Sequence, residues 1–193
     1  MKYNKKIKIF SLLLITILFS LLLVGCNNNS STEKNSQNEE NKEIETISFS
    51  NEENNIKFNY PNDFKELEGQ ELIDNLNVGN ISFEQDQVIF LSKSNEQLVI
   101  LLYEDLTDNA LENRKTSLDA LSSYSDLNIK LEQNDFITLN NSSVLKSTML
   151  TDGYKGTSFC FVTNNKLFVL QYMADADSFN QGIVNILENS ITF

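Results

Sequence analysis

The clearest pattern in the sequence is the alternation of apolar and polar residues in short runs. Ile47 and Phe49 alternate with polar neighbours, and after a polar turn the alternation resumes across 56–60. Period-two alternation is typical of strands with one buried face. Pro61, the only proline, ends the second run, because proline cannot donate to a strand ladder. Residues 46–61 therefore predict an antiparallel hairpin with one apolar face.

The run Leu98–Tyr103 differs, because its residues are apolar at both odd and even positions. Such a strand is stable when both of its faces are covered. We therefore expect it in the middle of a sheet, beneath helices on each side. Residues 88–91 are the expected neighbouring strand, across a turn at 92–95.

A helix is predicted directly after this strand. Thr107 or Asp108 offers a side-chain oxygen for capping its first turn, and the helix should end near Tyr124. Its expected buried stripe is Leu111, Leu118 and Leu121. A shorter helix is expected at 70–77, before the first strand of the sheet.

The second half of the sequence is a series of strands joined by short polar turns. The expected strands are 129–139, 143–151, 157–163 and 166–174. Asn164 and Asn165 suit a two-residue hairpin turn, because asparagine tolerates positive φ. Phe159 and Phe161 are expected to share one face. Another face is expected to carry Phe168, Leu170 and Tyr172.

The last predicted element is a helix that begins at Asp177 or Ser178. Its buried side is expected to carry Phe179, Ile183 and Ile186. The chain from residue 46 to 193 is long enough for one domain with its own hydrophobic core.

Residues 1–25 carry the pattern of an export signal. Four lysines precede the apolar run Ile9–Val24, and no acidic residue appears before Glu33. A positive segment followed by an apolar one is typical of a secretory signal peptide. The alternative is an uncleaved membrane helix, for which the run is short against the roughly 20 apolar residues of a full span.

The apolar run ends in Leu23-Val24-Gly25-Cys26, which resembles the bacterial lipobox. In that motif a diacylglyceryl group is joined to the cysteine sulfur before cleavage. The small Gly25 suits a peptidase pocket, and only a thiol forms the thioether. We expect Cys26 to carry the lipid and to hold the chain on the outer face of the cytoplasmic membrane, because two or three acyl chains suffice for stable anchoring.

The segment 26–45 is predicted to be a disordered linker behind the lipidated cysteine. Asn27–Glu45 has one apolar residue, Ile44. A segment of this composition cannot bury a core. The predicted organisation is therefore a signal peptide at 1–25, the linker at 26–45 and a globular domain at 46–193.

Charge narrows the choice of partners. Without residues 1–25, which contain four lysines and no acid, 11 basic residues face 27 acidic ones and the net charge is −16. Nucleic-acid binding is not expected, because it calls for a basic patch. An anionic bilayer surface would repel the domain, so the expected membrane attachment is the lipid. The 27 asparagines and single arginine favour an AT-rich genome and a low-GC Gram-positive source.

The chain has no histidine and no tryptophan. The usual near-neutral general base is therefore missing, as are the usual zinc ligand sets. Apart from Cys26 the only cysteine is Cys160, so no intramolecular disulfide is expected. We predict a protein that is not an enzyme, with no catalytic residues, no cofactor and no metal.

Two clusters of acidic residues are candidate sites. Asp175 and Asp177, with Asn180 nearby, offer oxygens to calcium, but the spacing departs from the calcium-loop template, so helix capping is preferred. A second cluster contains Glu104, Asp105 and Asp108. It suggests a carboxylate pair for glycoside hydrolysis, with a solvated helix cap as the preferred interpretation.

Cys160 lies between Phe159 and Phe161 on a predicted strand and points to the opposite face. It is expected to be a small buried hydrophobe, because a reactive thiol needs an electropositive neighbour that the local sequence lacks. The phenylalanine-rich strands suggest either a lipid pocket or core packing, and core packing is the simpler interpretation.

Several short segments of the sequence resemble the PsbP-like domain found in many bacterial lipoproteins. The segments are Ile56–Phe64, Tyr103–Leu106, Phe136–Asn141 and Val169–Phe193. The sequence departs from the family at Asn141, where glycine is customary, and at Phe64, where tryptophan is common. The resemblance implies an α+β fold, with an antiparallel β-sheet sandwiched between helices in a single α/β/α domain.

The PsbP-like family includes an extrinsic subunit of photosystem II, and other members bind proteins. The histidines proposed as metal ligands in the plant protein have no counterpart here. We therefore expect a membrane-anchored, non-catalytic module that binds a protein of the cell envelope. The alternative is a carrier of a small apolar ligand or lipid in a pocket between sheet and helix.

Overall fold

The computed structural model describes residues 44–76, 87–124, 128–151 and 153–193. Its strands are β1 (Thr46–Asn51), β2 (Ile56–Pro61), β3 (Lys65–Glu66), β4 (Val88–Ser94), β5 (Gln97–Asp105), β6 (Ile129–Leu139), β7 (Ser142–Thr151), β8 (Tyr154–Thr163) and β9 (Lys166–Asp175). Its helices are α2 (Gly69–Leu76), α3 (Ala110–Ser122) and α4 (Gln181–Ser190). The predicted signal peptide and most of the predicted linker lie outside the described residues. Within the described residues, no helix is long and apolar enough to cross a membrane.

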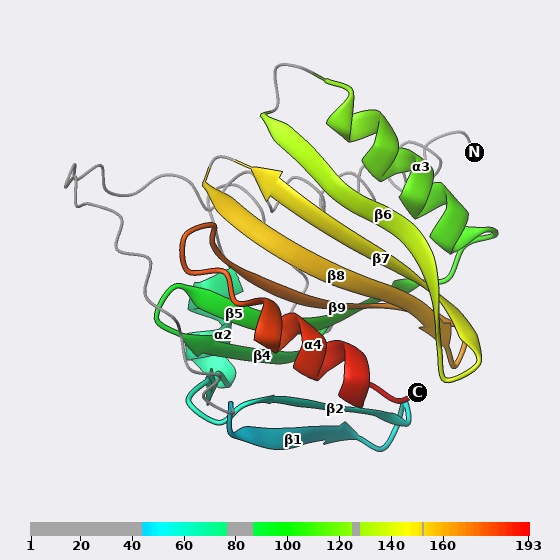
Figure 1. The fold of residues 1–193 in the computed structure, drawn as a ribbon. Helices are drawn as coiled ribbons and strands as arrows, with labels where there is room; N and C mark the ends of the chain where they lie inside the picture. Colours follow the sequence, from blue (N-terminus) through cyan, green and yellow to red (C-terminus); the bar gives the residue numbers. More distant parts are fainter. Residues whose placement is uncertain (1–43, 77–86, 125–127, 152) are drawn as a thin grey trace, which may run out of the picture.

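Seven strands form one sheet in the order β3-β4-β5-β9-β8-β7-β6, and all neighbours in it are antiparallel. The hairpin of β1 and β2 forms a separate two-stranded sheet that lies below the large one in Figure 1. The fold is therefore α+β with an antiparallel sheet, as the sequence predicted.

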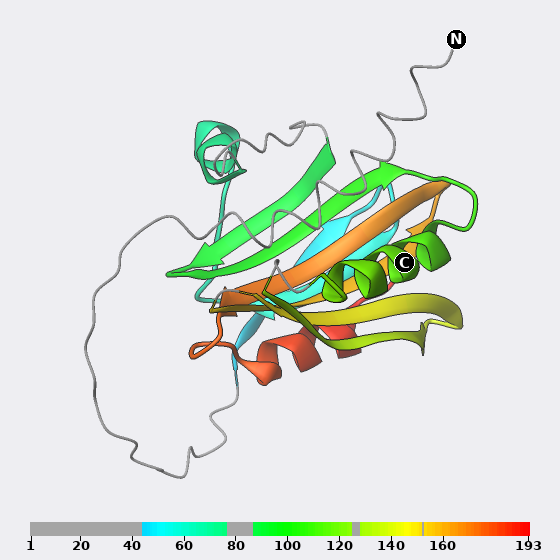
Figure 2. The same cartoon turned by 90° about the horizontal axis from the view of Figure 1, so that it is seen from above.

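The large sheet is the middle layer of the molecule. One face carries the main core, which joins the sheet to the hairpin and to α4 through residues such as Phe58, Phe90, Phe168 and Leu187. The opposite face is covered by α2 and α3, where Leu72 and Leu118 are buried against the sheet. Figure 2 shows α2 and α4 on opposite sides of the sheet.

Both faces of β5 are buried, as its continuous apolar run predicts. Val99 and Leu101 belong to the main core, whereas Ile100 and Leu102 belong to the cluster that contains Leu72 of α2. The strand also lies within the sheet, between β4 and β9. On the main-core side, however, the covering layer is the hairpin together with α4, not helices alone.

The prediction that the aromatic residues of β8 and β9 occupy different faces was wrong. In the register of these strands, Phe159 pairs with Leu170 and Phe161 pairs with Phe168. Residues that pair directly across an antiparallel ladder point to the same face. All four side chains, with Tyr172, are therefore in the main core.

The structure differs from the sequence prediction in the residue that precedes α3 and in the set of residues that the helix buries. The helix is preceded by Asn109, which has a φ of 53° and makes no side-chain cap hydrogen bond, so neither Thr107 nor Asp108 caps it. Leu111 and Leu121 are only half-buried. The buried residues of the helix are Ala110, Arg114 and Leu118.

The last helix also begins later than predicted. Asn180 is its N-cap, and its side-chain oxygen accepts a hydrogen bond from the Gly182 N–H at 2.8 Å. Asp177 and Ser178 lie in the turn before it, in which the Ser178 N–H donates to the Asp175 carbonyl. The buried residues are Ile183, Val184 and Leu187.

The C-terminal residues close the main core. Thr192 pairs with Lys57 on the side of β2 that faces away from β1, with both backbone hydrogen bonds formed (2.8 and 3.0 Å). The ring of Phe193 stacks on that of Phe161, with 4.2 Å between centroids. The end of the chain therefore joins the hairpin to the large sheet.

Candidate functional site

Cys26, the predicted lipidation site, lies outside the described residues. Its role therefore remains a prediction from the sequence. The described part of the chain offers two further places where polar groups converge.

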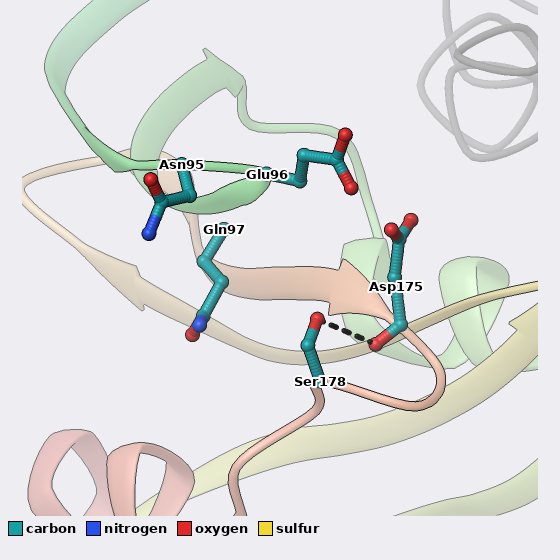
Figure 3. A pocket seen from close by; sticks show the side chains of 5 residues that line it. All are labelled: Asn95, Glu96, Gln97, Asp175 and Ser178. Atoms are coloured by element: carbon teal, nitrogen blue, oxygen red, sulfur yellow. Dashed lines mark hydrogen bonds between the residues drawn. The ribbon is translucent and has the colours of Figure 1, made fainter. Parts of the chain in front are cut away.

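The first place is an open depression at one end of the sheet, with a volume of about 470 Å³. Its lining residues come from the β4–β5 turn and from the end of β9 with the loop after it: Asn95, Glu96, Gln97, Asp175 and Ser178. Figure 3 shows the carboxylate of Glu96 and the side chain of Asp175 on the same side of this depression. The pairing of β5 with β9 brings the two segments together, because Leu98 faces Met173 in the register.

Hydrogen bonds order one wall of the depression. The Tyr172 hydroxyl donates to Gln97 Oε1 at 2.8 Å and accepts from the Asn180 N–H at 3.1 Å. Ser178 Oγ donates to the backbone carbonyl of Asp175 at 3.2 Å. The wall therefore ties β5, β9 and the start of α4 together.

The two carboxyl groups of the depression, on Glu96 and Asp175, interact electrostatically. A hydrogen bond with Asp175, followed by repulsion from its charge, raises the pKa of Glu96. The pKa of the Tyr154 hydroxyl is also raised, first by burial and then by the charges of Asp175 and Glu96.

The sequence anticipated one member of this acidic pair and missed the other. Asp175 was a candidate calcium ligand with Asp177, and the structure places Glu96 beside it. No local signal reveals Glu96, because strand pairing joins residues that are far apart in the sequence. Across the described residues, no group of three or more histidine, cysteine, aspartate or glutamate side chains is placed to hold a metal ion.

The second place is a buried cluster beneath α3. Arg114 Nη1 donates to Glu104 Oε1 at 3.1 Å, and both side chains are almost fully buried. Glu104 is therefore not part of a solvated cap, which corrects the sequence interpretation, whereas Asp105 and Asp108 are exposed. Arg114 Nε has no hydrogen-bond partner within the described residues.

Cys160 belongs to the same cluster. It lies on the face of β8 opposite to the main core and is fully buried among Leu145, Val169 and Ala110. The electropositive neighbour that the local sequence lacks is supplied by Arg114. Burial nevertheless raises the pKa of the Cys160 thiol, although the Arg114 charge partly offsets this. The thiol is therefore a protonated, buried group.

The interface between the sheet, the hairpin and α4 is filled by side chains. Phe58 contacts the rings of Phe49 and Phe90, with centroid separations of 5.0 and 5.3 Å. Phe161 stacks on Phe168 at 5.7 Å. The phenylalanine-rich strands therefore form a packed core at these positions.

These features describe an α+β protein with a PsbP-like fold and no assembled catalytic set among its described residues. No family model matches the sequence, and no curated protein matches it. The fold is similar to the solution structure of cyanobacterial PsbP (CyanoP) from Synechocystis sp. PCC 6803, with a TM-score of 0.51. The match covers 89% of this chain and 98% of that chain at 9% sequence identity, so it concerns the fold alone.

Two more distant structures also align with the chain. One is a Bacteroides thetaiotaomicron protein (TM-score 0.46, 11% identity, 75% of this chain and 47% of that chain). The other is LpqN, involved in cell envelope biogenesis of Mycobacterium tuberculosis (TM-score 0.43, 13% identity, 78% of this chain and 91% of that chain). Both likenesses are too distant to carry a functional argument.

Proposed function

We propose that this chain is a lipid-anchored accessory module of the bacterial cell envelope that acts by binding another envelope protein. The observation that carries the proposal is the order of three segments. An apolar run ends in Leu23-Val24-Gly25-Cys26, a polar segment follows, and a folded domain begins at Thr46. This order tethers a folded module to the outer face of the membrane and lets it move over a limited distance.

The state of the polar groups favours binding over catalysis. Glu104 and Arg114 form a buried ion pair under α3, and Glu96 lies beside Asp175, which raises the pKa of Glu96. Cys160 is buried and protonated. Without histidine in the sequence, none of these groups has a near-neutral base beside it.

The packed core favours a protein-binding module over a lipid carrier. A carrier needs an apolar cavity of several hundred cubic ångströms. The interface where such a cavity was expected is occupied by aromatic side chains, and the open depression at the sheet end is lined by polar residues.

Tethering to the membrane allows a weak contact with a membrane-bound partner to support a stable association. A module on a linker meets a membrane-bound partner at a high effective concentration, so a modest intrinsic affinity supports a stable association. With a net charge of −16 after removal of residues 1–25, the partner's contact surface should be neutral or basic. Association should therefore weaken as salt screens the attraction.

The test is crosslinking in intact cells with wild type and two linker variants. One variant lacks residues 27–43, and the other replaces them with a glycine-serine segment of the same length. Ile44 and Glu45 are kept, because the Glu45 carbonyl accepts from the Asn62 N–H. The deletion should abolish or redirect the crosslinks, and the replacement should preserve them. The carrier alternative replaces this proposal if no variant captures a protein and the purified chain carries a co-purified, non-covalent lipid.

A further inference from the structure

Besides β2, whose outer side bonds to Thr192 and Ser190, the described sheets have three edge strands of very different character. β3 has two residues, both charged. β6 carries Lys130, Glu132 and Asp135 and has a bulge between Leu131 and Gln133. Short length, charge and bulges are the devices that keep an edge strand from pairing with another chain. Both edges of the large sheet are therefore protected.

The third edge, β1, has none of these devices. Its sequence, TISFSN, is the only one among the described strands that contains no charged residue. It also lacks proline and a bulge, and it pairs with β2 alone over its full length. In Figure 1 it forms the outer margin of the molecule beyond β2.

The backbone groups that β1 turns outward follow from the hydrogen bonds of β2. Pairs in an antiparallel ladder alternate between bonded and non-bonded. The Lys57 N–H donates to the Thr192 carbonyl, and the Lys57 carbonyl accepts from the Thr192 N–H. The Asn59 N–H donates to Ser190 Oγ. These two β2 residues therefore point away from β1. Their partners, Ser50 and Ser48, must turn their own N–H and C=O groups to the free edge.

The same alternation extends to Thr46, which pairs with Pro61. Proline has no N–H, so this pair needs no donor from β2. Within the described residues, no strand lies beside the free edge of β1, to which Thr46, Ser48 and Ser50 each turn a backbone N–H and C=O.

The apolar face of β1 is also incomplete at this edge. Phe49 packs against Phe90 with 4.6 Å between ring centroids. Ile47, on the same face, is 43% exposed. An added strand with apolar residues at alternate positions would cover Ile47 and continue the core-facing layer.

Charge identifies the kind of strand that fits. Glu45 precedes β1, and Glu52 and Glu53 follow it, all exposed. In an antiparallel pair of two β1 strands, Glu45 of each copy would meet the Glu52–Glu53 end of the other, and this like-charge contact is unfavourable. A strand with an uncharged centre and basic residues at its ends meets opposite charge instead.

We propose that β1 is a strand-addition site that binds an extended segment of an envelope protein, alternating apolar and polar at its centre and basic at both ends. The inference rests on the proposed function and assigns its contact surface. Because β1 directly follows the predicted linker, the site also lies at the tethered end of the domain.

The experiment measures binding of a labelled peptide, three threonine-valine repeats with two lysines at each end, to the purified full-length chain in detergent. Ser48→Pro removes one outward N–H without removing a bond to β2, and proline is tolerated on edge strands. Ser48→Ala is the matched control, because it loses the same hydroxyl contact to Asn59 but keeps the N–H. Ser48→Pro should weaken binding about tenfold, and Ser48→Ala should not.

Two further peptides make the test independent of how well Ser48→Pro folds. An N-methylated version, which cannot complete the ladder, and a version with glutamates in place of the lysines should both bind much more weakly. Equal binding of the N-methylated peptide, or of Ser48→Pro with an unchanged thermal midpoint, overturns the proposal. A dimer of the purified chain that Ser48→Pro dissociates would make a second copy the occupant and overturn it as well.

The in-cell crosslinks separate this inference from the proposed function. If crosslinks form in wild type and persist in Ser48→Pro, an envelope partner binds elsewhere and only the strand-addition site is wrong. If wild type forms no crosslinks, the proposed function itself fails.

Discussion

Asparagine has a specific conformational use in this chain. Eight residues other than glycine have positive φ in the described structure, and all are asparagine: Asn55, Asn95, Asn109, Asn128, Asn140, Asn141, Asn164 and Asn165. The left-handed region costs most residues 1–2 kcal/mol, and asparagine reduces this cost through local hydrogen bonds. The asparagine content, interpreted from the sequence as genome bias, therefore also serves the turns.

The β8–β9 turn tests this use. Asn165 has a φ of 58° and is exposed. Asn165→Ala should lower the free energy of unfolding by about 1 kcal/mol, whereas Asn165→Gly should leave it nearly unchanged, because glycine adopts positive φ freely. Urea unfolding of the three proteins measures the difference. Equal stability of the alanine and glycine variants would contradict the argument.

The buried pair of Glu104 and Arg114 is a second feature of individual residues. Removing one member of a buried ion pair leaves the other charge without compensation, which costs about 3–5 kcal/mol. Arg114→Met should therefore be strongly destabilising in a urea titration. Adding Glu104→Gln should restore much of the loss, because the uncompensated charge is gone. A double variant no more stable than Arg114→Met would show that packing, not charge, dominates at this position.

At the scale of elements, the limits of some strands were predicted closely, whereas β4 ends later and β8 begins earlier than the sequence predicted. The limits of β6 and β7 agree with the sequence prediction to within one residue, because alternation and the Asn140-Asn141 turn are local signals. Helix caps depend on where the chain enters the helix. Several polar residues precede α4, and only the folded geometry selects Asn180 among them.

The choice of cap gives a direct prediction. Asn180→Ala should lower the free energy of unfolding by about 1 kcal/mol, because the hydrogen bond to the Gly182 N–H is lost. Asp177→Ala, at the position that the sequence favoured, should have little effect. Thermal denaturation of both variants distinguishes the two caps, and a larger loss for Asp177→Ala would reverse the assignment.

The contact between the β4–β5 turn and the end of β9 should depend on pH. The folded structure raises the pKa of Glu96 above its ordinary value of 4.5, so between the ordinary and the raised pKa the folded state binds more protons than the unfolded state. Stability from this contact is therefore present at low pH and is lost as pH rises through the raised pKa. Glu96→Gln, which resembles the protonated form, should gain stability relative to wild type over this range. A difference that is constant with pH would contradict the raised pKa of Glu96.

For the whole molecule, the central prediction is that Cys26 is the covalent anchor. Replacing it with serine removes the thiol that lipidation requires. Cells that express Cys26→Ser should therefore lack the processed, membrane-bound form of the protein. Cell fractionation with immunoblotting measures both size and location, and Cys160→Ser serves as the control that retains Cys26. Cys26→Ser protein found in the membrane fraction at the processed wild-type size would disprove the lipoprotein prediction.

The sequence by itself determined most strands and the two-sided burial of β5, because periodicity and asparagine turns are local properties, and its resemblance to PsbP-like domains implied the α+β class. It also supplied the stretch that resembles a lipobox and predicts lipidation of Cys26, because such a motif is a linear signal. Only the tertiary structure decided which distant groups meet. Strand pairing brings Asp175 beside Glu96, and the packing of α3 places Arg114 against Glu104 and Cys160. The free edge of β1 likewise emerges only once Thr192 occupies the other side of β2, because the directions of backbone groups depend on pairing and not on composition.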